Sequence, residues 1–237
     1  MSIASRIKNK FKRPPPPAPN YKKCYAQSGE DMIMAFIILH LKLQNITYLD
    51  IGCHHPYFLS NTAFFYENGA TGVCVEPDPL LFKVIAEERK RDVCLNAGIG
   101  TSNQSSADFY IMSEKTLNTF SKEDAVRYES YGSKKIEQVI KVPLIRVNEV
   151  MEKYFNPCPT IVSLDTEGFD LEILKSIDFK KFRPQIFCIE TITYTENGTE
   201  EKVFPILDFM KQNGYFVYAD TYINSIFIDK QTWDNNK

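Results

Sequence analysis

Short apolar runs alternate with longer amphipathic stretches along most of the chain after residue 20. Apolar runs bounded by Gly, Asn or Asp are typical of buried strands, whereas apolar positions three or four residues apart indicate helices. We therefore expect strands at residues 47–51, 71–76, 92–97, 107–112, 138–144, 160–165, 185–190, 215–219 and 223–229. We expect helices at residues 28–43, 61–67, 79–90, 146–154, 170–176 and 200–213.

Two helix starts carry local signals. Ser28 stands before Glu30 and Asp31, which predicts a side-chain cap followed by acids near the positive end of the helix dipole. Pro79 fits the first turn of the helix that follows the second strand. The polar stretch between the strands at 107–112 and 138–144 predicts a loop or a mobile cover.

The order of elements predicts the fold class. Strand–helix alternation with buried strands indicates an α/β domain with a mainly parallel sheet, right-handed crossovers and helices on both faces. The last two expected strands are separated by a tight turn, which indicates an antiparallel hairpin at the sheet edge. Ligands of such sheets bind beyond the carboxyl ends of the strands. The residues just after each strand are therefore the candidates for a site.

A proline run separates a tail from this domain. PPPPAP at residues 14–19 is extended polyproline, so we expect a basic tail at residues 1–20 and one domain at residues 21–237. Ile3, Ile7 and Phe11 recur every four residues among five bases. On a helix this stripe would suit weak association with an anionic membrane surface, and a disordered basic tail is the equally compatible alternative.

Composition narrows the function classes. The net charge of −2 offers no overall electrostatic basis for binding nucleic acid. Six scattered cysteines without a CxxC pair favour reduced thiols and a cytoplasmic location. The longest apolar run, at residues 32–41, is too short to span a membrane, and the N-terminal bases are followed by no apolar core of a secretory signal.

Three successive strand ends carry residues suited to an adenosine-containing ligand. They are Asp50 and Gly52, Glu76 and Pro77, and Asn96 and Ala97. A carboxylate after the second strand can accept both hydroxyls of a ribose, and an amide after the third can read an adenine edge. Neither the dinucleotide fingerprint GxGxxG nor the phosphate loop GxxxxGK[ST] is present. The set predicts an adenosine ligand without a pyrophosphate, and S-adenosylmethionine fits.

Six segments in order resemble the FkbM-type methyltransferases. They are AQSGED at 26–31, DIGCHHPYFLSNT at 50–62, VEP at 75–77, LNAGI at 95–99, SLDTEG at 163–168 and FCIE at 187–190. The resemblance extends from residue 26 to about 228. The chain departs from the family at Thr166, where Val is common, and at Cys53, where a small residue is frequent.

The resemblance implies a fold, an activity and a cofactor site. The fold is a Rossmann-like, seven-stranded class I methyltransferase sheet with a C-terminal hairpin, and the activity is O-methylation of hydroxyls on sugars or natural products. Asp50, Gly52, Glu76 and Asn96 would line S-adenosylmethionine. Gln27, Glu30 and Asn61 would reach its methionine end.

The sulfonium is already activated, so methyl transfer requires alignment of the acceptor hydroxyl and removal of its proton. Because a sugar hydroxyl is a poor acid, a base or a metal should assist this removal. The candidates for this role are Asp165, Glu190 and His55, with His54 and Glu167 as further possibilities. Asp165 and Glu190 follow neighbouring strands, so we expect them in one cleft. Two facing carboxylates could share a proton, with one acting as a base, or they could bind Mg²⁺ that acidifies the hydroxyl. Both readings stay open from the sequence.

The sequence therefore predicts a cytoplasmic S-adenosylmethionine-dependent O-methyltransferase that acts on a sugar, glycan or glycolipid precursor. One alternative is a catalytically silent S-adenosylmethionine-binding or scaffold module, which would bind the cofactor without turnover. Another is a nicotinamide dehydrogenase of similar architecture, which the missing glycine fingerprint disfavours.

Overall fold

The computed structural model describes residues 23–195 and 199–236. The expected tail at residues 1–20, with its apolar stripe and proline run, lies outside the described residues.

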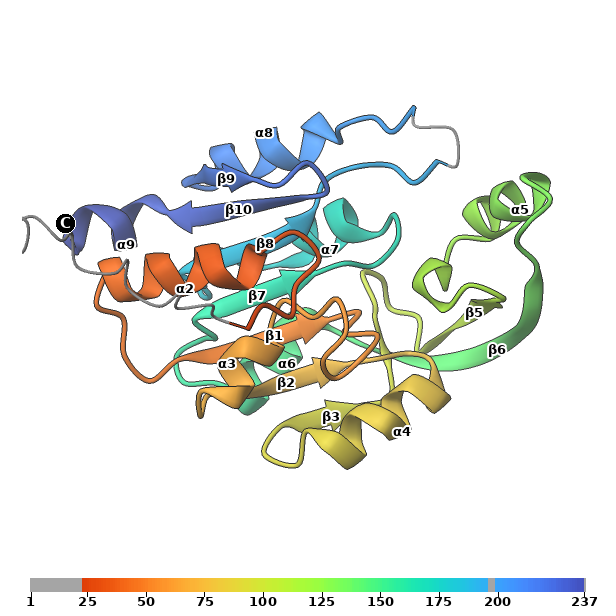
Figure 1. Ribbon diagram of the computed structural model, residues 1–237, viewed down its shortest axis with the longest axis horizontal. Helices are drawn as coiled ribbons and strands as arrows, with labels where there is room; N and C mark the ends of the chain where they lie inside the picture. Colours follow the sequence, from red (N-terminus) through yellow and green to blue (C-terminus); the bar gives the residue numbers. More distant parts are fainter. Residues whose placement is uncertain (1–22, 196–198, 237) are drawn as a thin grey trace, which may run out of the picture.

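A seven-stranded sheet forms the centre of the described part of the chain (Figure 1). Its strands are β1 (Thr47–Ile51), β2 (Thr71–Val75), β3 (Val93–Leu95), β7 (Ile161–Leu164), β8 (Ile186–Glu190), β9 (Tyr215–Asp220) and β10 (Asn224–Asp229). The strand order is β3-β2-β1-β7-β8-β10-β9, and β10 alone runs in the direction opposite to the other six strands. The predicted α/β class, the mainly parallel sheet and the terminal hairpin are confirmed.

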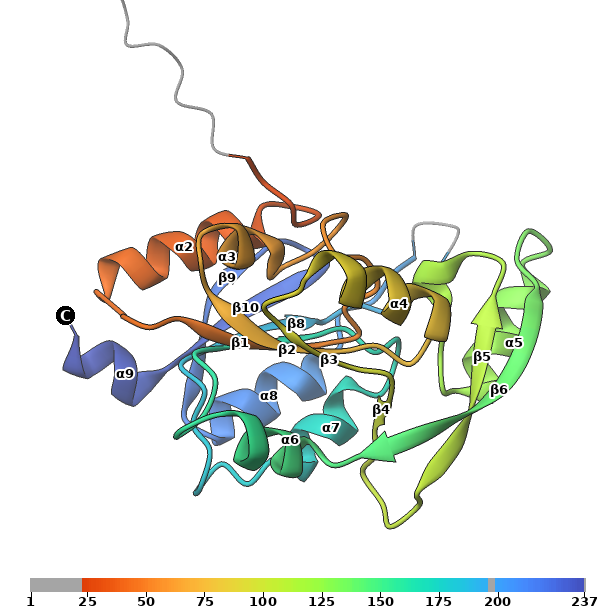
Figure 2. The same cartoon turned by 90° about the horizontal axis from the view of Figure 1, so that it is seen from below.

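Helices cover both faces of the sheet (Figure 2). One face carries α2 (Glu30–His40), α3 (Ala63–Glu67) and α4 (Pro79–Glu88), and the other carries α6 (Val147–Tyr154), α7 (Asp170–Ser176) and α8 (Phe204–Gln212). A short helix, α9 (Lys230–Asn235), follows β10. Strand side chains alternate between the two layers: Leu49 packs in the core beneath α6–α8, and Tyr48 packs in the core beneath α2 and α3.

An additional three-stranded sheet lies beyond the carboxyl ends of β1, β2 and β7 (Figures 1 and 2). It comprises β4 (Gly98–Ile99), β5 (Ser106–Met112) and β6 (Ile136–Ile145) in the order β4-β6-β5. The 3₁₀ turn η1 (Lys115–Leu117) and α5 (Lys122–Ser130) connect β5 to β6. The expectation of an irregular loop here was wrong, because the segment forms η1 and α5, and Ser121 caps α5 by accepting the Asp124 N–H at 3.1 Å. The alternative expectation of a mobile cover stays a prediction.

Two helix starts differ from the expected positions. Ser28 does not cap α2: Gly29 is the cap residue, with φ 93°, and the Glu30 carboxylate turns back to accept the Ser28 N–H at 2.8 Å. Helix α8 begins at Phe204 rather than near residue 200, because Lys202 forms an antiparallel bridge with Ile192. Both differences arise from contacts between segments that helix periodicity does not encode.

A buried arginine holds the loop after β1 in place. The Arg89 side chain is fully buried, and its guanidinium donates to the Pro56 carbonyl at 2.6 Å and to the Ser60 and Thr62 hydroxyls at 2.7 Å. The Asp50 carboxylate lies 4.0 Å from the same guanidinium. The end of α4 therefore fixes the segment that connects β1 to α3.

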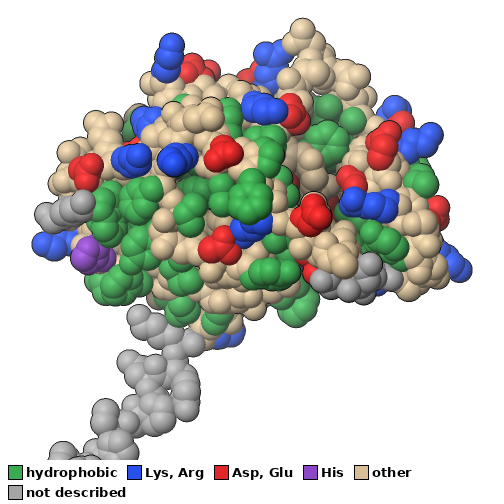
Figure 3. All heavy atoms as spheres, turned by 90° about the horizontal axis from the view of Figure 1, so that it is seen from above, with side chains coloured by type: hydrophobic (Ala, Val, Ile, Leu, Met, Phe, Trp, Pro, Cys, Tyr) green, Lys and Arg blue, Asp and Glu red, His purple; other side chains and the backbone are tan. Residues whose placement is uncertain are grey.

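One face of the molecule carries side chains of both charges. On the face that includes β9 and α8, acidic and basic side chains are interspersed with hydrophobic ones (Figure 3). Across residues 23–195 and 199–236, no helix combines the length and the apolar character needed to cross a bilayer.

Candidate functional site

A cavity of about 340 Å³ opens at the carboxyl ends of β1, β7 and β8. Its wall brings together eight of the residues singled out in the sequence: Gln27, Asp50, Gly52, His54, Asn61, Asp165, Glu167 and Glu190. The start of β10 lies at the same edge, because β10 runs antiparallel to β8. Segments from distant parts of the chain therefore converge where parallel sheets bind ligands.

Gly52 lies where β1 and β7 come closest. Its backbone has φ 78°, and a Cβ at this position would fall 1.8 Å from the Asp165 carbonyl oxygen. The Gly52 N–H donates to the Val75 carbonyl at 3.0 Å, so the turn is also tied to β2. Only glycine fits this position without moving the backbone of Asp165.

Gly52 also contributes to a second, apolar slot beside the cavity. The slot is lined by Pro77 and Ala97 from the expected set, together with Ile51, Val75, Gly98, Ile99, Phe109, Asn118, Phe120 and Thr166. The rings of Phe109 and Phe120 lie 4.7 Å apart between centroids and close the slot from β5 and from the segment between η1 and α5. The slot has a volume of only about 40 Å³, so its apolar and aromatic walls are suited to contact with an edge of a flat heterocycle such as a purine rather than to enclosing it.

Glu76 is buried at the end of β2, next to the slot. One carboxylate oxygen accepts the His54 N–H and the other accepts the Asp78 N–H, both at 2.8 Å. Burial raises the pKa of the carboxyl to about 8, although these two hydrogen bonds oppose the shift. In its ionised form, above this pKa, the carboxylate has about four acceptor positions, so two remain for hydroxyl donors of a ligand.

Two expected cofactor residues have structural hydrogen bonds instead. Asn96 does not line the cavity or the slot, and its amide donates to the carbonyls of Glu76 and Pro77 at 2.9 and 3.1 Å. The fully buried Glu30 accepts from Thr221 at 2.6 Å and from Asn224 at 3.1 Å. Asn96 therefore shapes the turn after β2, and Glu30 fixes α2 to the β9–β10 turn.

Asp50 and Asn61 lie together in the cavity wall. Asp50 accepts the Thr62 hydroxyl at 2.5 Å, and Asn61 donates to the Ser163 hydroxyl at 3.2 Å. Burial raises the pKa of Asp50, while Arg89 and the hydrogen bonds act in the opposite direction. Gln27 reaches the same wall from the segment before α2.

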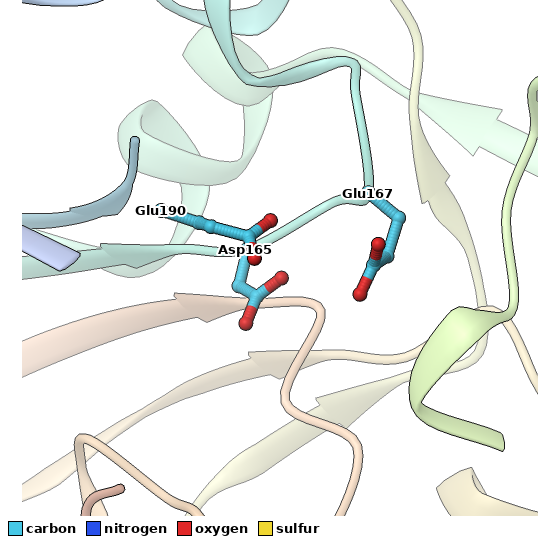
Figure 4. A group of neighbouring side chains, drawn as sticks. All are labelled: Asp165, Glu167 and Glu190. Carbon is cyan, nitrogen blue, oxygen red and sulfur yellow. The ribbon is translucent and has the colours of Figure 1, made fainter. Parts of the chain in front are cut away.

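Three carboxyl groups meet on one side of the cavity (Figure 4). Asp165, Glu167 and Glu190 each offer one oxygen, and these oxygens all lie within 4.8 Å of one another. Burial and the neighbouring carboxylates raise the pKa of all three groups, that of Asp165 to about 7. The juxtaposition of Asp165 and Glu190 expected from adjacent strands is present, and Glu167 is the third member.

The two histidines have different positions. His55 does not line the cavity: its Nδ1 accepts the N–H groups of Tyr57 and Phe58 at 3.1 and 2.9 Å, and burial and Arg89 lower its pKa. It therefore orders a turn, because an Nδ1 that accepts hydrogen bonds is not free to take a proton. His54, one residue earlier, lines the cavity.

Asn224 is a site residue that the sequence patterns did not indicate. It lies in the cavity wall with only 4% of its surface exposed. Its amide nitrogen donates to Glu30, which leaves Oδ1 facing the other way, buried and without a hydrogen-bond partner in the described chain. Asn224 is the first residue of an antiparallel strand, whereas the sequence-based prediction of the site considered only the carboxyl ends of strands.

Comparison with known protein families identifies the family of the chain. The family described as "Methyltransferase FkbM domain" matches residues 50–217, which is more than half of the chain. No curated protein matches the chain.

Solved methyltransferases show a distant likeness. Precorrin-6y C5,15-methyltransferase from Geobacter metallireducens is 11% identical, with 83% of this chain and 87% of that chain covered and a TM-score of 0.41. Magnesium protoporphyrin IX methyltransferase from Synechocystis, with bound S-adenosylhomocysteine, is 9% identical, with 84% and 79% covered and a TM-score of 0.41. Likeness at this level carries no information about the substrate.

The family match runs from the end of β1 into β9 and includes the Gly52 turn, the carboxylates at the ends of β2, β7 and β8, and the cavity wall apart from Gln27, Ile223 and Asn224. The chain therefore belongs to the FkbM methyltransferase domain family.

Proposed function

We propose that the protein is an S-adenosylmethionine-dependent O-methyltransferase whose acceptor is a sugar, a glycan or a glycolipid precursor. One observation carries the proposal: the apolar slot and the carboxylate-lined cavity meet at Gly52, with Glu76 buried at their margin. This arrangement provides a place for adenine, an acceptor for ribose hydroxyls and a polar chamber for the methionine end and the acceptor.

The described residues fit the cofactor in three ways. The slot walls formed by Pro77, Ala97 and Phe120 would hold adenine by apolar contact. The two remaining acceptor positions of Glu76 would take the ribose 2′ and 3′ hydroxyls. Gln27 and Asn61 would hydrogen-bond the amino-acid end in the cavity.

The chemistry requires positioning and proton removal. S-adenosylmethionine supplies an activated methyl group: the S–CH₃ bond breaks, its electron pair stays on sulfur, and an O–CH₃ bond forms. The cavity wall would orient the acceptor hydroxyl, and Asp165 or Glu190 would take its proton. These two carboxylates face the cavity from adjacent strands, so an acceptor in the chamber lies within reach of both.

The polar character of the cavity supports a hydroxylated acceptor. Besides the carboxylates, its wall carries the amide and hydroxyl side chains of Gln27, Asn61, Thr116, Ser163, Thr195 and Asn224. Sugars bind through many hydrogen bonds to such groups. A flat apolar acceptor would leave them unpaired at a cost of about 1–3 kcal/mol each.

The test is methyl transfer from labelled S-adenosylmethionine to a panel of glycosides, nucleotide sugars and lipid-linked sugars. Asp165→Asn and Glu190→Gln should lower turnover at least about a hundredfold, the usual scale of acid–base catalysis, while cofactor binding persists. Glu87→Gln, on the exposed side of α4, is the matched control. Cofactor binding without transfer to any acceptor would favour the catalytically silent module instead.

The location is part of the same proposal. All six cysteines are free, which suits a reducing compartment, and we place the enzyme in the cytoplasm. The basic tail would add weak attraction to anionic membranes. Deleting residues 1–19 and measuring binding to anionic vesicles tests this, since unchanged binding would discard the tether.

A further inference from the structure

The carboxyl groups of Asp165, Glu167 and Glu190 are held together by the backbone. The pairing of Leu164 with Ile189 places the next residues along the chain, Asp165 just after β7 and Glu190 at the end of β8, side by side. The chain then turns sharply, with Glu167 in the left-handed region at φ 51°. A non-glycine residue rarely adopts this conformation, and here it brings the third carboxyl group back to the other two.

The cluster has no basic partner within the described residues. None of the ion pairs found there includes Asp165, Glu167 or Glu190. The charged groups that act on the cluster are themselves acidic, Asp50 and Asp170 among them. Half-buried carboxylates at this spacing repel one another strongly, so a cation would lower the energy of the ionised cluster.

A separate observation points to an oxygen ligand beside the cluster. Asn224 is the direct register partner of Glu190, so the two side chains project from the same face of the sheet at the cavity. The hydrogen bond from its amide nitrogen to Glu30 fixes the orientation of the group. The buried Oδ1 is left without a partner in the described chain, and a buried acceptor in that state is costly.

We propose that Asp165, Glu167 and Glu190 bind one divalent cation of the hard, oxygen-preferring class, such as Mg²⁺ or Mn²⁺, with the Asn224 carbonyl as a neighbouring oxygen ligand. The ligand set contains only carboxylate and amide oxygens, which is the set these ions prefer. Such ions take about six ligands, so positions remain for water and for the acceptor.

The proposal rests on the proposed function and deepens it by naming the acceptor class. A cation with open positions favours an acceptor that presents two adjacent oxygens, such as a vicinal diol of a sugar. Binding to the cation makes the hydroxyl more acidic. With one oxygen of Asp165 or Glu190 on the cation, the second oxygen of that carboxyl group would take the proton while the hydroxyl oxygen attacks the methyl group.

The test is direct ion binding to the full chain after treatment with a chelator. Mn²⁺ is titrated into the protein at pH 8, and the free ion is followed by electron paramagnetic resonance. We expect one site, weakened at least about tenfold by Glu167→Gln and by Glu190→Gln, since loss of even an outer-shell partner costs that much. Glu172→Gln, an exposed acid on α7, should leave the affinity unchanged.

Binding of S-adenosylhomocysteine is measured in the same samples and separates the two claims. If the cofactor product binds and Mn²⁺ does not, or if Glu167→Gln binds Mn²⁺ as the wild type does, the cation site is refuted and the proposed function stands. If Mn²⁺ binds and the nucleoside does not, the proposed function fails. Retained nucleoside binding by the variants also shows that they are folded.

Discussion

The Glu76 carboxylate allows the sharpest test of the cofactor site. Both of its oxygens already accept one backbone N–H, from His54 and from Asp78, at 2.8 Å. In the proposed cofactor site, the ribose hydroxyls bind to the remaining acceptor positions of this carboxylate. Glu76→Gln keeps the shape of the side chain and one of the two oxygens, and it replaces the other oxygen by a donor.

The expected loss of ligand affinity follows from the number of acceptor positions that the substitution removes. At a pH above about 8, where the Glu76 carboxyl is ionised, a hydrogen bond to this charged group contributes about 1.5–3 kcal/mol, so removal of one ribose contact raises Kd by roughly 10- to 100-fold. The new amide also faces a backbone N–H, which costs about 1–3 kcal/mol of folding stability. In a chain of this size each kcal/mol lowers Tm by about 2–4 °C.

Calorimetric titration of S-adenosylhomocysteine and of adenosine measures the effect, with unfolding followed separately by heat. Both ligands should lose the same factor, because the contact is with the ribose they share. Glu87→Gln lies on the exposed side of α4 and should change neither quantity. A folded Glu76→Gln protein that binds both ligands as tightly as the wild type would refute the ribose assignment.

Three further predictions follow from particular contacts. The pKa of Glu76 is raised to about 8, so below this pH the native state holds a proton that the unfolded chain releases near pH 4. Between about pH 4 and pH 8 the free energy of unfolding should therefore fall with rising pH, by up to about 1.4 kcal/mol per pH unit. Urea unfolding at pH 6 and pH 8 should show a smaller difference in Glu76→Gln, and an equal difference would contradict this. Gly52→Ala should abolish nucleoside binding, because its Cβ would fall 1.8 Å from the Asp165 carbonyl; Gly69→Ala, with a similar φ but open space, should retain it. Arg89→Met should lower the free energy of unfolding by about 3–5 kcal/mol in urea titration, since it leaves the buried carboxylate of Asp50 without its cation; a loss below about 1 kcal/mol would count against this role.

The sequence predicted the sheet well because its strands are short, apolar and bounded by turn residues. The residues that follow these strands also predicted much of the site, because Asp50, Gly52, Asp165 and Glu190 meet in one cavity. Their convergence follows from parallel pairing, which brings successive carboxyl ends to one edge.

The remaining features depend on contacts that no local pattern encodes. Phe109 reaches the slot because β5, β6 and β4 pair across a long separation in sequence, and Phe120 follows Thr119, which forms a bridge with Tyr110 of β5. Glu167 joins the carboxylates through a left-handed turn, and His55 is withdrawn from them by two backbone N–H groups. In each case the residue type was visible in the sequence, but its orientation was set by tertiary structure.

The central claim is that this site binds S-adenosylmethionine. The most direct measurement is a calorimetric titration of S-adenosylmethionine and S-adenosylhomocysteine into the wild-type protein, with NADH as the comparison. The account predicts one site per chain for both sulfur nucleosides, with micromolar dissociation constants, and no binding of NADH. A folded sample that binds neither nucleoside, or that binds NADH in their place, would contradict it.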